Sequence, residues 1–423
     1  MRILWLTMQA LPIIYKQIEP NKSIPPTGGW MEGISKEVIK NNADEFGYCF
    51  PYDKLLDGRV DGFRYYSYIL ISDFHTYSEQ DLERLEYIIR DFKPDVIHLF
   101  GTEHTHQSQL VHMVNKIGMI DRLVIWIQGL VSVYSTHYNA GVPESVIKAR
   151  TLKEWIKRNN VNDLRNNMAR RGEEEIACLK VAKHVFVRTD WDEAACKTIN
   201  PNLKVHFCNE SLRSSFYEEP KWDISRVKRH TIFLSQANYP IKGLHMMIEA
   251  LHIVKAEFPD TRVLTTGSDY LHYTTTVDKL RLSSYQKEII RLLRKYDLMD
   301  SLVFQGMLSE EQMRQQYLDA NVFVLPSSIE NSPNSLGEAM LLGTPVVASD
   351  VGGVKNMMKH GVDGLMYPFD EPYVMAEYVC RIFRDDDLAV RYSHNAMKHA
   401  ALTHSQVDNY RQLIKVYAEI IRE

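Results

Sequence analysis

Residues 322–353 read VFVLPSSIENSPNSLGEAMLLGTPVVASDVGG. The apolar run that ends at Leu325 is typical of a buried strand, and Glu330 follows it in a turn. Pro333 suits the first position of a helix, which puts Glu338 one turn further in. Glycines and prolines fall where turns are needed before the next apolar run, Val346–Ser349. The stretch therefore predicts a strand, a helix and a second strand of an α/β sheet.

The start of this helix is a predicted anion site. Backbone N–H groups near Asn334, Ser335 and Leu336 are free at a helix N-terminus, and with the helix dipole they attract a phosphate without a metal. Glu330 and Glu338 flank that end, and carboxylates are strong acceptors for sugar hydroxyls. Phosphate and hydroxyl recognition side by side indicate a pocket for a nucleotide sugar.

Length and composition point to a globular protein of two domains. The 423 residues suit two cores of about 200 residues each, and 45% apolar with 25% charged residues is ordinary for such a chain. A net charge of -4 argues against a nucleic-acid partner. The odd number of scattered cysteines favours a reducing, cytoplasmic compartment over a disulfide or zinc framework; they are Cys49, Cys178, Cys196, Cys208 and Cys380.

The opening apolar run, residues 1–14, is interrupted by Gln9 and Pro12, so we interpret it as a buried strand rather than a signal peptide. No segment approaches the roughly 20 apolar residues that span a bilayer. Any membrane contact is therefore expected to be peripheral.

Strand-like and helix-like stretches alternate along both halves of the chain, which favours two parallel, doubly wound sheets. Polar residues with a proline at 214–230 indicate the linker. We therefore predict domains at 1–213 and 214–403, facing a cleft at the carboxyl ends of their strands. The predicted strands are 3–6, 96–100, 123–128, 184–188, 231–234, 263–266, 302–305, 322–325 and 346–349, and the predicted helices include 30–40, 107–116 and 243–258.

Glu330 and Glu338, together with the sequence around them, resemble the E-x7-E signature of family 4 glycosyltransferases of the GT-B fold. This surrounding sequence consists of the strand before Pro326-Ser327, the run Gly343-Thr344-Pro345 and the pair Gly352-Gly353. Other runs look like the bacterial surface-polysaccharide branch. The resemblance implies a retaining hexosyltransferase that uses a nucleotide-diphosphate sugar with no metal or cofactor. It also implies that Glu338 holds ribose hydroxyls, that Glu330 holds donor-sugar hydroxyls, and that a last helix, 404–423, crosses back onto the first domain.

Lys242 matches the lysine that binds the donor diphosphate in this family. Gly28 and Gly29 resemble the family's glycine loop, which approaches the phosphates from the other domain. The chain departs from the pattern where an arginine usually precedes the lysine, because Gln236 and Ala237 stand there. Gln236 remains as an uncharged donor, and Arg188 or Arg213 are candidate replacements for the arginine that serve equally well as salt-bridge residues.

Gln128 ends a strand where many relatives carry a histidine. A glutamine takes no proton at neutral pH, so it is expected to orient a hydroxyl rather than act as a base. His104 and His106 follow the preceding strand and are candidates for binding the acceptor. Asp190-Trp191-Asp192 is interpreted as a helix cap and not as a metal motif.

The stretch 148–171 holds eight basic residues against Glu154 and Asp163. Two interpretations stand equally: contact with an anionic membrane or a lipid-linked diphosphate, and a solvated face balanced by Glu173–Glu175.

The sequence thus predicts transfer of a sugar from a nucleotide-diphosphate donor to a carbohydrate or lipid-linked acceptor in surface polysaccharide or glycoconjugate synthesis. Two alternatives stay open. One is a sugar-nucleotide epimerase of the same fold, and the other is a catalytically idle nucleotide-sugar-binding protein.

Overall fold

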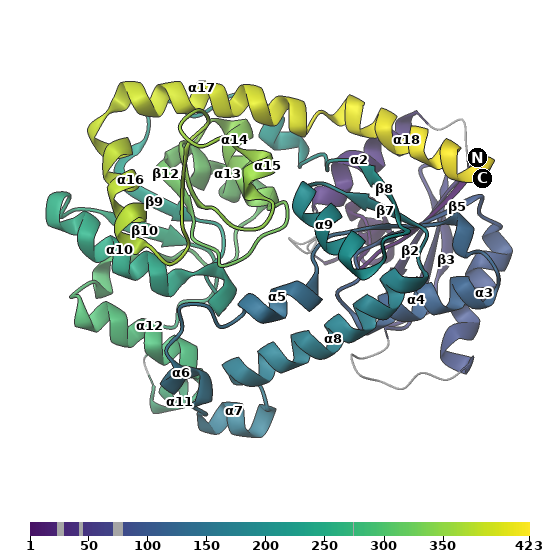
Figure 1. The fold of residues 1–423 in the computed structure, drawn as a ribbon, viewed down its shortest axis with the longest axis horizontal. Coiled ribbons are helices and arrows are strands. Elements are labelled where there is room, and N and C mark those ends of the chain that lie inside the picture. Colours follow the sequence, from purple (N-terminus) through teal and green to yellow (C-terminus); the bar gives the residue numbers. More distant parts are fainter. Residues whose placement is uncertain (23–28, 42–44, 71–78, 274) are drawn as a thin grey trace. The chain divides into compact units, whose positions relative to one another are not determined.

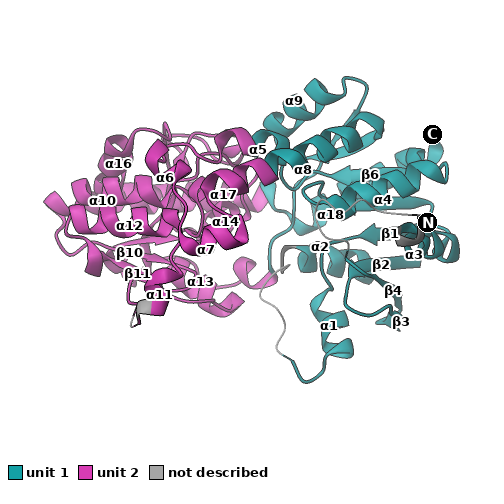
Figure 2. Ribbon diagram, turned by 90° about the horizontal axis from the view of Figure 1, so that it is seen from below, with its two compact units in different colours: residues 1–134, 168–213, 403–423 teal, residues 135–167, 214–402 magenta. Residues whose placement is uncertain are grey.

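The computed structural model describes residues 1–22, 29–41, 45–70, 79–273 and 275–423. The chain divides into two units (Figure 2). The first comprises Met1–Tyr134, Met168–Arg213 and Thr403–Glu423, and the second comprises Ser135–Asn167 and Ser214–Leu402. The sequence prediction placed all of residues 1–213 in the first domain, whereas residues 135–167 pack with the second unit.

A mostly parallel sheet forms the centre of the first unit. Among the described residues its strands follow the order β3-β4-β2-β1-β5-β6-β7-β8, and only β3 and β4 pair antiparallel. The sequence predicted β1, β5, β6 and β7 and did not anticipate the others. The strands are β1 (Arg2–Leu6), β2 (Glu45–Pro51), β3 (Asp57–Val60), β4 (Phe63–Tyr68), β5 (Val96–Phe100), β6 (Leu123–Trp126), β7 (His184–Val187) and β8 (Lys204–Phe207).

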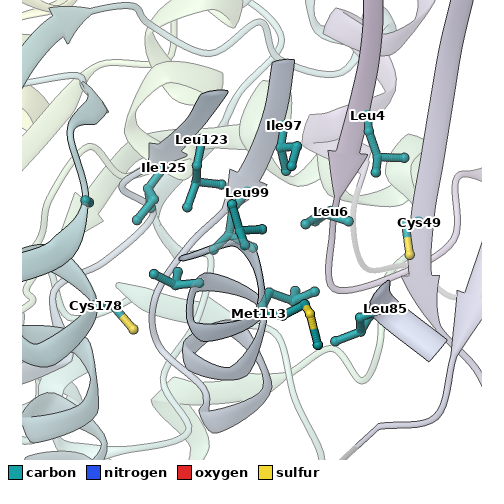
Figure 3. Close-up of a cluster of buried hydrophobic side chains, with 14 of the residues drawn as sticks. Leu4, Leu6, Cys49, Leu85, Ile97, Leu99, Met113, Leu123, Ile125 and Cys178 are labelled. Carbon is teal, nitrogen blue, oxygen red and sulfur yellow. The ribbon is translucent and has the colours of Figure 1, made fainter. Parts of the chain in front are cut away.

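Helices cover both faces of this sheet, because alternate residues of each strand point to opposite sides and both sets are apolar. Leu4 and Leu6 of β1 belong to the cluster drawn in Figure 3, while Ile3 and Trp5 belong to the cluster on the other face. The helices are α1 (Pro12–Ile18), α2 (Gly29–Lys40), α3 (Glu79–Phe92), α4 (Thr105–Lys116), α5 (Val131–His137), α8 (Val161–Val181), α9 (Asp190–Ile199) and α18 (Gln406–Arg422), of which α5 and α8 each run from one unit into the other.

The C-terminal helix α18 packs on the first sheet (Figure 1). Leu413 and Tyr417 of α18 are fully buried in the same cluster as Trp5. The Trp5 indole N–H donates to the Tyr417 hydroxyl at 3.0 Å, and His98 Nδ1 lies 2.5 Å from the same oxygen. His98 therefore has a structural role inside the unit.

The second unit is built on a parallel sheet with the order β11-β10-β9-β12-β13-β14 in the described chain. β9 begins at Lys228, so the end of the predicted linker is a strand. The strands are β9 (Lys228–Leu234), β10 (Arg262–Thr265), β11 (Leu302–Phe304), β12 (Ala320–Leu325), β13 (Val346–Ser349) and β14 (Leu365–Tyr367). The helices are α6 (Glu144–Lys148), α7 (Leu152–Lys157), α10 (Leu244–Glu257), α11 (Thr276–Leu280), α12 (Ser284–Lys295), α13 (Glu310–Asp319), α14 (Asn334–Leu342), α15 (Val354–Met357), α16 (Pro372–Arg384) and α17 (Asp386–Thr403).

Buried polar contacts tie residues 135–167 to the second unit. His245 of α10 donates from Nε2 to the Ala140 carbonyl at 3.0 Å, because a carbonyl oxygen only accepts. In the neutral ring Nδ1 is then the acceptor, and the Tyr285 hydroxyl lies 3.0 Å from it. Ala140 and His245 lie more than one hundred residues apart in sequence, so no local sequence pattern links this segment to the second unit.

His245 is expected to make the second unit less stable in acid. Burial, opposed by the Ala140 hydrogen bond and by attraction to Glu288, lowers the pKa of His245 to about 4. An unfolded histidine binds a proton near pH 6.5, so the unfolded state takes up the proton first and stability falls as the pH drops from 6.5 towards 4. The loss amounts to about 3 kcal/mol at most.

Thermal unfolding measured between pH 7 and pH 4.5 tests this expectation with His245→Gln and, as the control, His252→Gln at an exposed position of the same helix. The His245 variant should be less stable at pH 7 and should lose less of its stability on acidification. Equal acid-induced losses in the wild type and in both variants would show that His245 does not cause the effect.

Among the described helices, none is long and apolar enough to cross a membrane. All five cysteines are buried free thiols.

Candidate functional site

Two loops of the second unit meet where the strand order reverses. β9 and β12 are neighbours at the centre of the sheet, and the chain leaves them towards opposite edges. Such a switch point is where open α/β sheets bind ligands. The loops after the two strands are joined by the Ser328 N–H, which donates to the Ile241 carbonyl at 2.8 Å.

Gly243 permits this close approach. Its φ is +68°, and a Cβ atom there would lie 1.7 Å from the Pro326 carbonyl oxygen. Only glycine combines that backbone conformation with that contact. The loop that carries Lys242 is therefore held directly against the loop that carries Glu330.

Lys242 and Glu330, both predicted site residues, form an ion pair at this point. The Lys242 Nζ atom lies 2.6 Å from Glu330 Oε1, and the two side chains are 17% and 8% exposed. The Ser327 hydroxyl donates to the same carboxylate oxygen at 2.6 Å. The structure thus brings together the predicted ammonium and the predicted carboxylate of the candidate site.

The Lys242 ammonium stays charged despite its surroundings. Burial by itself lowers the pKa of Lys242, but the attraction of Glu330, the nearby Tyr239 and the hydrogen bond to Glu330 outweigh it, so the pKa is raised. A positive charge is therefore present at the switch point at any physiological pH.

The backbone around Glu330 is fixed from the side of β13. The Gly353 N–H donates to the Glu330 carbonyl at 3.0 Å, and the Ser349 hydroxyl donates to the Ser327 carbonyl at 2.6 Å. Gly352 has a φ of +51°, and a Cβ atom there would lie 1.9 Å from the Glu330 carbonyl oxygen. The Gly-Gly pair of the sequence signature thus serves to position Glu330.

The helix after Glu330 begins one residue later than predicted. Pro333 is the N-cap of α14, and its carbonyl accepts from the Leu336 N–H at 3.0 Å. The Leu336 amide, predicted to be free for an anion, is therefore used within the helix cap. Asn334 and Ser335 are half-buried at the first turn, and the Asn334 Oδ1 atom is buried without a hydrogen-bond partner in the described chain.

Glu338 lies on α14 and is 7% exposed. The Tyr317 hydroxyl at the end of α13 donates to Glu338 Oε2 at 3.3 Å and approaches the Ser335 carbonyl at 3.2 Å. Tyr317 thereby orients the Glu338 carboxylate, a role that the sequence did not reveal.

Other predicted donor-binding residues are less informative. Gln236 is exposed just after β9. Gly29 is the first residue of α2, and Gly28 lies outside the described residues.

In the first unit Gln128 and Arg188 lie together beyond β6 and β7. The Gln128 backbone carbonyl accepts from Arg188 Nη2 at 2.8 Å, while Arg188 Nη1 lies 2.9 Å from Glu210 Oε2. The side chains of Arg188 and Glu210 are only 3% and 2% exposed. This geometry favours the salt-bridge interpretation of Arg188 over the predicted contact with a donor diphosphate.

The two predicted acceptor-binding histidines lie near each other beyond β5. His104 is the N-cap of α4, and Arg171 Nη1 donates to its Nδ1 atom at 3.2 Å. His106 is 3% exposed and contacts the Met8 sulfur atom. Of the two, only His104 is partly open to solvent.

Glu175 is a buried residue of this region that sequence reasoning missed. Its carboxylate accepts from the Thr102 hydroxyl at 2.9 Å, from the Val131 N–H at 3.1 Å, and from the N–H and hydroxyl of Ser132 at 3.0 and 2.5 Å. Burial, opposed by these hydrogen bonds, raises the pKa of Glu175 to about 7. Glu175 fixes the loops after β5 and β6, whereas one of the two interpretations of the basic stretch made it a solvated acid that balances a basic face.

The Asp-Trp-Asp run is not itself the cap of α9. Thr189 caps the helix through its side chain, which accepts from the Asp192 N–H, and Asp192 accepts from the Arg188 N–H at 3.0 Å. Within the described residues, no group of three or more metal-binding side chains is close enough to hold an ion.

The basic stretch 148–171 contributes residues to both units. Arg150 pairs with Asp163 at 2.7 Å, and Arg171 donates inward to the Glu103 carbonyl at 3.2 Å. Residues up to 167 belong to the second unit and the rest to the first. The stretch is split because α8 runs from one unit into the other.

Comparison with known proteins supports the predicted class. Residues 218–399 match the family model Glycosyl transferases group 1. The putative glycosyltransferase YtcC of Bacillus subtilis is 26% identical over 187 residues, 43% of each chain. A phosphatidyl-myo-inositol mannosyltransferase of Mycolicibacterium smegmatis is 29% identical over 181 residues, 42% of each chain. The chain thus matches less than half the length of these curated relatives.

Solved structures resemble the chain over nearly its whole length. A sucrose-phosphate synthase from Thermosynechococcus elongatus has a TM-score of 0.70 at 16% identity and covers 99% of both chains. HepE of Anabaena, solved in complex with UDP and glucose, has a TM-score of 0.65 at 15% identity and also covers 99% of both chains. These likenesses confirm the predicted GT-B fold class of two Rossmann-like parallel-sheet domains.

Proposed function

We propose that the whole chain is a retaining, metal-independent glycosyltransferase of family 4, because residues 218–399 match the family model of group 1 glycosyl transferases. It transfers a sugar from a nucleotide-diphosphate donor to a carbohydrate or lipid-linked acceptor in surface polysaccharide or glycoconjugate synthesis. The observation that carries the proposal is the Lys242–Glu330 pair at the switch point of the second sheet.

Lys242 and the start of α14 bind the donor diphosphate in this proposal. An ammonium group has three N–H donors, and Glu330 accepts from one of them, which leaves donors for phosphate oxygens. The amides of Asn334 and Ser335 and the dipole of α14 add positive potential at the same end of the sheet. As the sugar–phosphate bond breaks, negative charge grows on the leaving diphosphate, and this arrangement stabilises it.

The two glutamates recognise hydroxyl groups. Glu338, held by Tyr317, binds the ribose, and Glu330 binds the hydroxyls of the donor sugar. Both carboxylates are nearly buried, so their hydrogen bonds to a ligand form in a medium where they are stronger than in water.

Retention follows from attack on the same face as the departing group. The acceptor hydroxyl oxygen bonds to the anomeric carbon as the bond to the diphosphate breaks, and the hydroxyl proton passes to a diphosphate oxygen. Gln128 takes no proton and orients a hydroxyl. The products are the new glycoside and the nucleoside diphosphate.

A screen of nucleotide sugars by thermal shift tests the proposal, since a donor at a hundred times its Kd stabilises the fold by about 2.7 kcal/mol. Donors that bind are then mixed with candidate acceptors in the presence of EDTA, and the anomeric configuration of the product is read by NMR. Conversion of the sugar nucleotide without an acceptor would instead indicate an epimerase. Binding without turnover under all acceptors would indicate an idle binder.

Replacing Glu338 with glutamine is expected to weaken donor binding by about tenfold, because charge-assisted hydrogen bonds to the ribose become neutral ones. Calorimetric titration of the donor identified by the screen measures the change. Glu311→Gln, at an exposed position of α13, is the control and should bind like the wild type. Equal affinities for all three proteins would remove Glu338 from the proposed site.

A peripheral contact between the basic stretch 148–171 and an anionic membrane is the remaining part of the proposal.

A further inference from the structure

Helix α7 turns its apolar side chains to solvent. Leu152, Trp155 and Ile156 are 62%, 67% and 67% exposed, and they share one face of the helix because they are spaced by three and four residues. An ordinary surface helix buries such a face. Helix α7 is therefore oriented the other way round from an ordinary surface helix. Its large apolar side chains are not covered by other side chains in the described part of the unit.

A buried carboxylate fixes that orientation. Glu154 is 1% exposed, and its Oε1 atom accepts from the N–H and the hydroxyl of Ser284 at 2.9 and 3.0 Å. Its Oε2 atom accepts from the Thr151 N–H at 2.9 Å. A carboxylate buried with three hydrogen bonds resists rotation into solvent, so the apolar residues on the other side of α7 stay outside.

Helix α11 lies beside α7 and adds two more exposed apolar side chains (Figure 1). The Lys153 Nζ atom donates to the Arg281 carbonyl, just after α11, at 3.0 Å. Val277 and Leu280 of α11 are 55% and 56% exposed. We call the five side chains Leu152, Trp155, Ile156, Val277 and Leu280 the α7–α11 surface.

Positive charges accompany this surface. Lys157 and Arg158 end α7, and Lys279 and Arg281 belong to α11 or follow it; all four are exposed. Nearby acids offset only part of this charge, because Glu154 is buried and Asp278 forms an ion pair with Arg281 at 3.8 Å. Anionic partners are therefore favoured over neutral or basic ones.

We propose that the α7–α11 surface inserts into the headgroup region of an anionic lipid bilayer. The amphipathic ring of Trp155 is of the kind that prefers the membrane–water interface. Lys157 and Lys279 are exposed on α7 and α11 and can attract acidic lipid headgroups. Exposed apolar side chains next to basic ones can anchor a peripheral protein both by insertion into the bilayer and by charge. A basic stretch without apolar side chains binds an anionic membrane by charge alone. The inference deepens the proposed membrane contact and does not depend on the glycosyl-transfer reaction.

Vesicle sedimentation with the full-length protein tests the proposal. The wild type is expected to sediment with vesicles of equal phosphatidylcholine and phosphatidylglycerol and not with phosphatidylcholine alone. The double variant Trp155→Ser with Ile156→Ser should bind the anionic vesicles at least about tenfold more weakly, because two large side chains no longer leave water. The control is Tyr373→Ser with Leu402→Ser, which removes two apolar side chains elsewhere in the unit that are 59% and 78% exposed, and it should bind normally.

The charges give a second, separable effect. Lys157→Gln with Lys279→Gln should weaken binding to the anionic vesicles by roughly fivefold for each residue. Quenching of Trp155 fluorescence by brominated lipids, measured as the difference between the wild type and Trp155→Phe, reports insertion without relying on a disruptive variant.

Three results would overturn the inference. They are no binding of the wild type to anionic vesicles, equal binding of the apolar double variant, and a wild-type dimer in sedimentation velocity that the double variant loses. The last result would assign the surface to a second copy of the chain. Transfer to a water-soluble acceptor without vesicles should be the same in the wild type and the double variant, so a failure of this inference is distinguishable from a failure of the proposed function.

Discussion

Replacing Lys242 with methionine is expected to lower the rate of sugar transfer by about 10²–10³-fold, because one preorganised charge no longer stabilises the leaving diphosphate. Methionine keeps a flexible apolar stem of similar reach, so the loop is filled while the charge is lost. The rate is measured with saturating donor, which separates the chemical step from weaker binding. Lys287→Met, at an exposed position of α12, is the matched control and should retain full activity.

The same variant leaves Glu330 nearly buried without its counter-ion. Removing one partner of a buried ion pair costs about 3–5 kcal/mol of stability. Lys242 and Glu330 are still 17% and 8% exposed, so the loss of stability in this variant should not exceed that range. Combining Lys242→Met with Glu330→Gln removes both charges, so the double variant should recover stability in thermal unfolding but stay inactive. Recovery of transfer in the double variant would mean that the pair is structural and that Lys242 does not act on the donor.

Gly243→Ala is expected to destabilise the second unit by about 3 kcal/mol or more, because the new methyl group meets the Pro326 carbonyl oxygen 1.7 Å away. A loss of that size lowers the Tm by about 6–12 °C for a unit of this size. The two loops must separate to make room, so Lys242 moves away from Glu330 and transfer is lost as well. Differential scanning calorimetry and the transfer assay measure the two effects.

Gly361→Ala separates this clash from backbone strain alone. Gly361 has a φ of +73°, similar to the +68° of Gly243, but nothing lies within 4 Å of the position where its Cβ atom would be. This control should cost only about 1 kcal/mol and leave transfer unchanged. If both alanine variants unfold at the same temperature, the contact with the Pro326 carbonyl does not contribute to the loss of stability in Gly243→Ala.

Local patterns predicted the centre of each sheet well. The apolar runs at β1, β5, β6, β7, β9, β10, β11, β12 and β13 are short, continuous and bounded by turn residues, as buried parallel strands are. β2 and β4 escaped detection although their aromatic residues favour strands, because both runs carry glycine, proline or charged residues that obscure the pattern.

The sequence predicted contacts in the candidate site only where the residue type and a neighbouring turn point to them. Lys242 and Glu330 meet because a turn follows each of two strands that the fold makes neighbours, and the sequence shows both turns. The roles of Glu175 and Tyr317 depend on partners far away in sequence, at positions 102, 132 and 338, so no local pattern could reveal them. Arg188 illustrates the same limit, because an arginine at a strand end is equally suited to a phosphate and to the buried Glu210.

The path of the chain through its two units determines where the second unit can be exchanged with that of a relative. Residues 135–167 belong to the second unit, where His245 holds the Ala140 carbonyl and Ser284 holds Glu154. In a hybrid protein that takes only residues 214–402 from a relative, residues 135–167 of this chain would have to pack against the relative's residues instead of His245 and Ser284. Recombination breakpoints at 134/135 and 167/168, added to those at 213/214 and 402/403, would transplant the unit with its own partners intact.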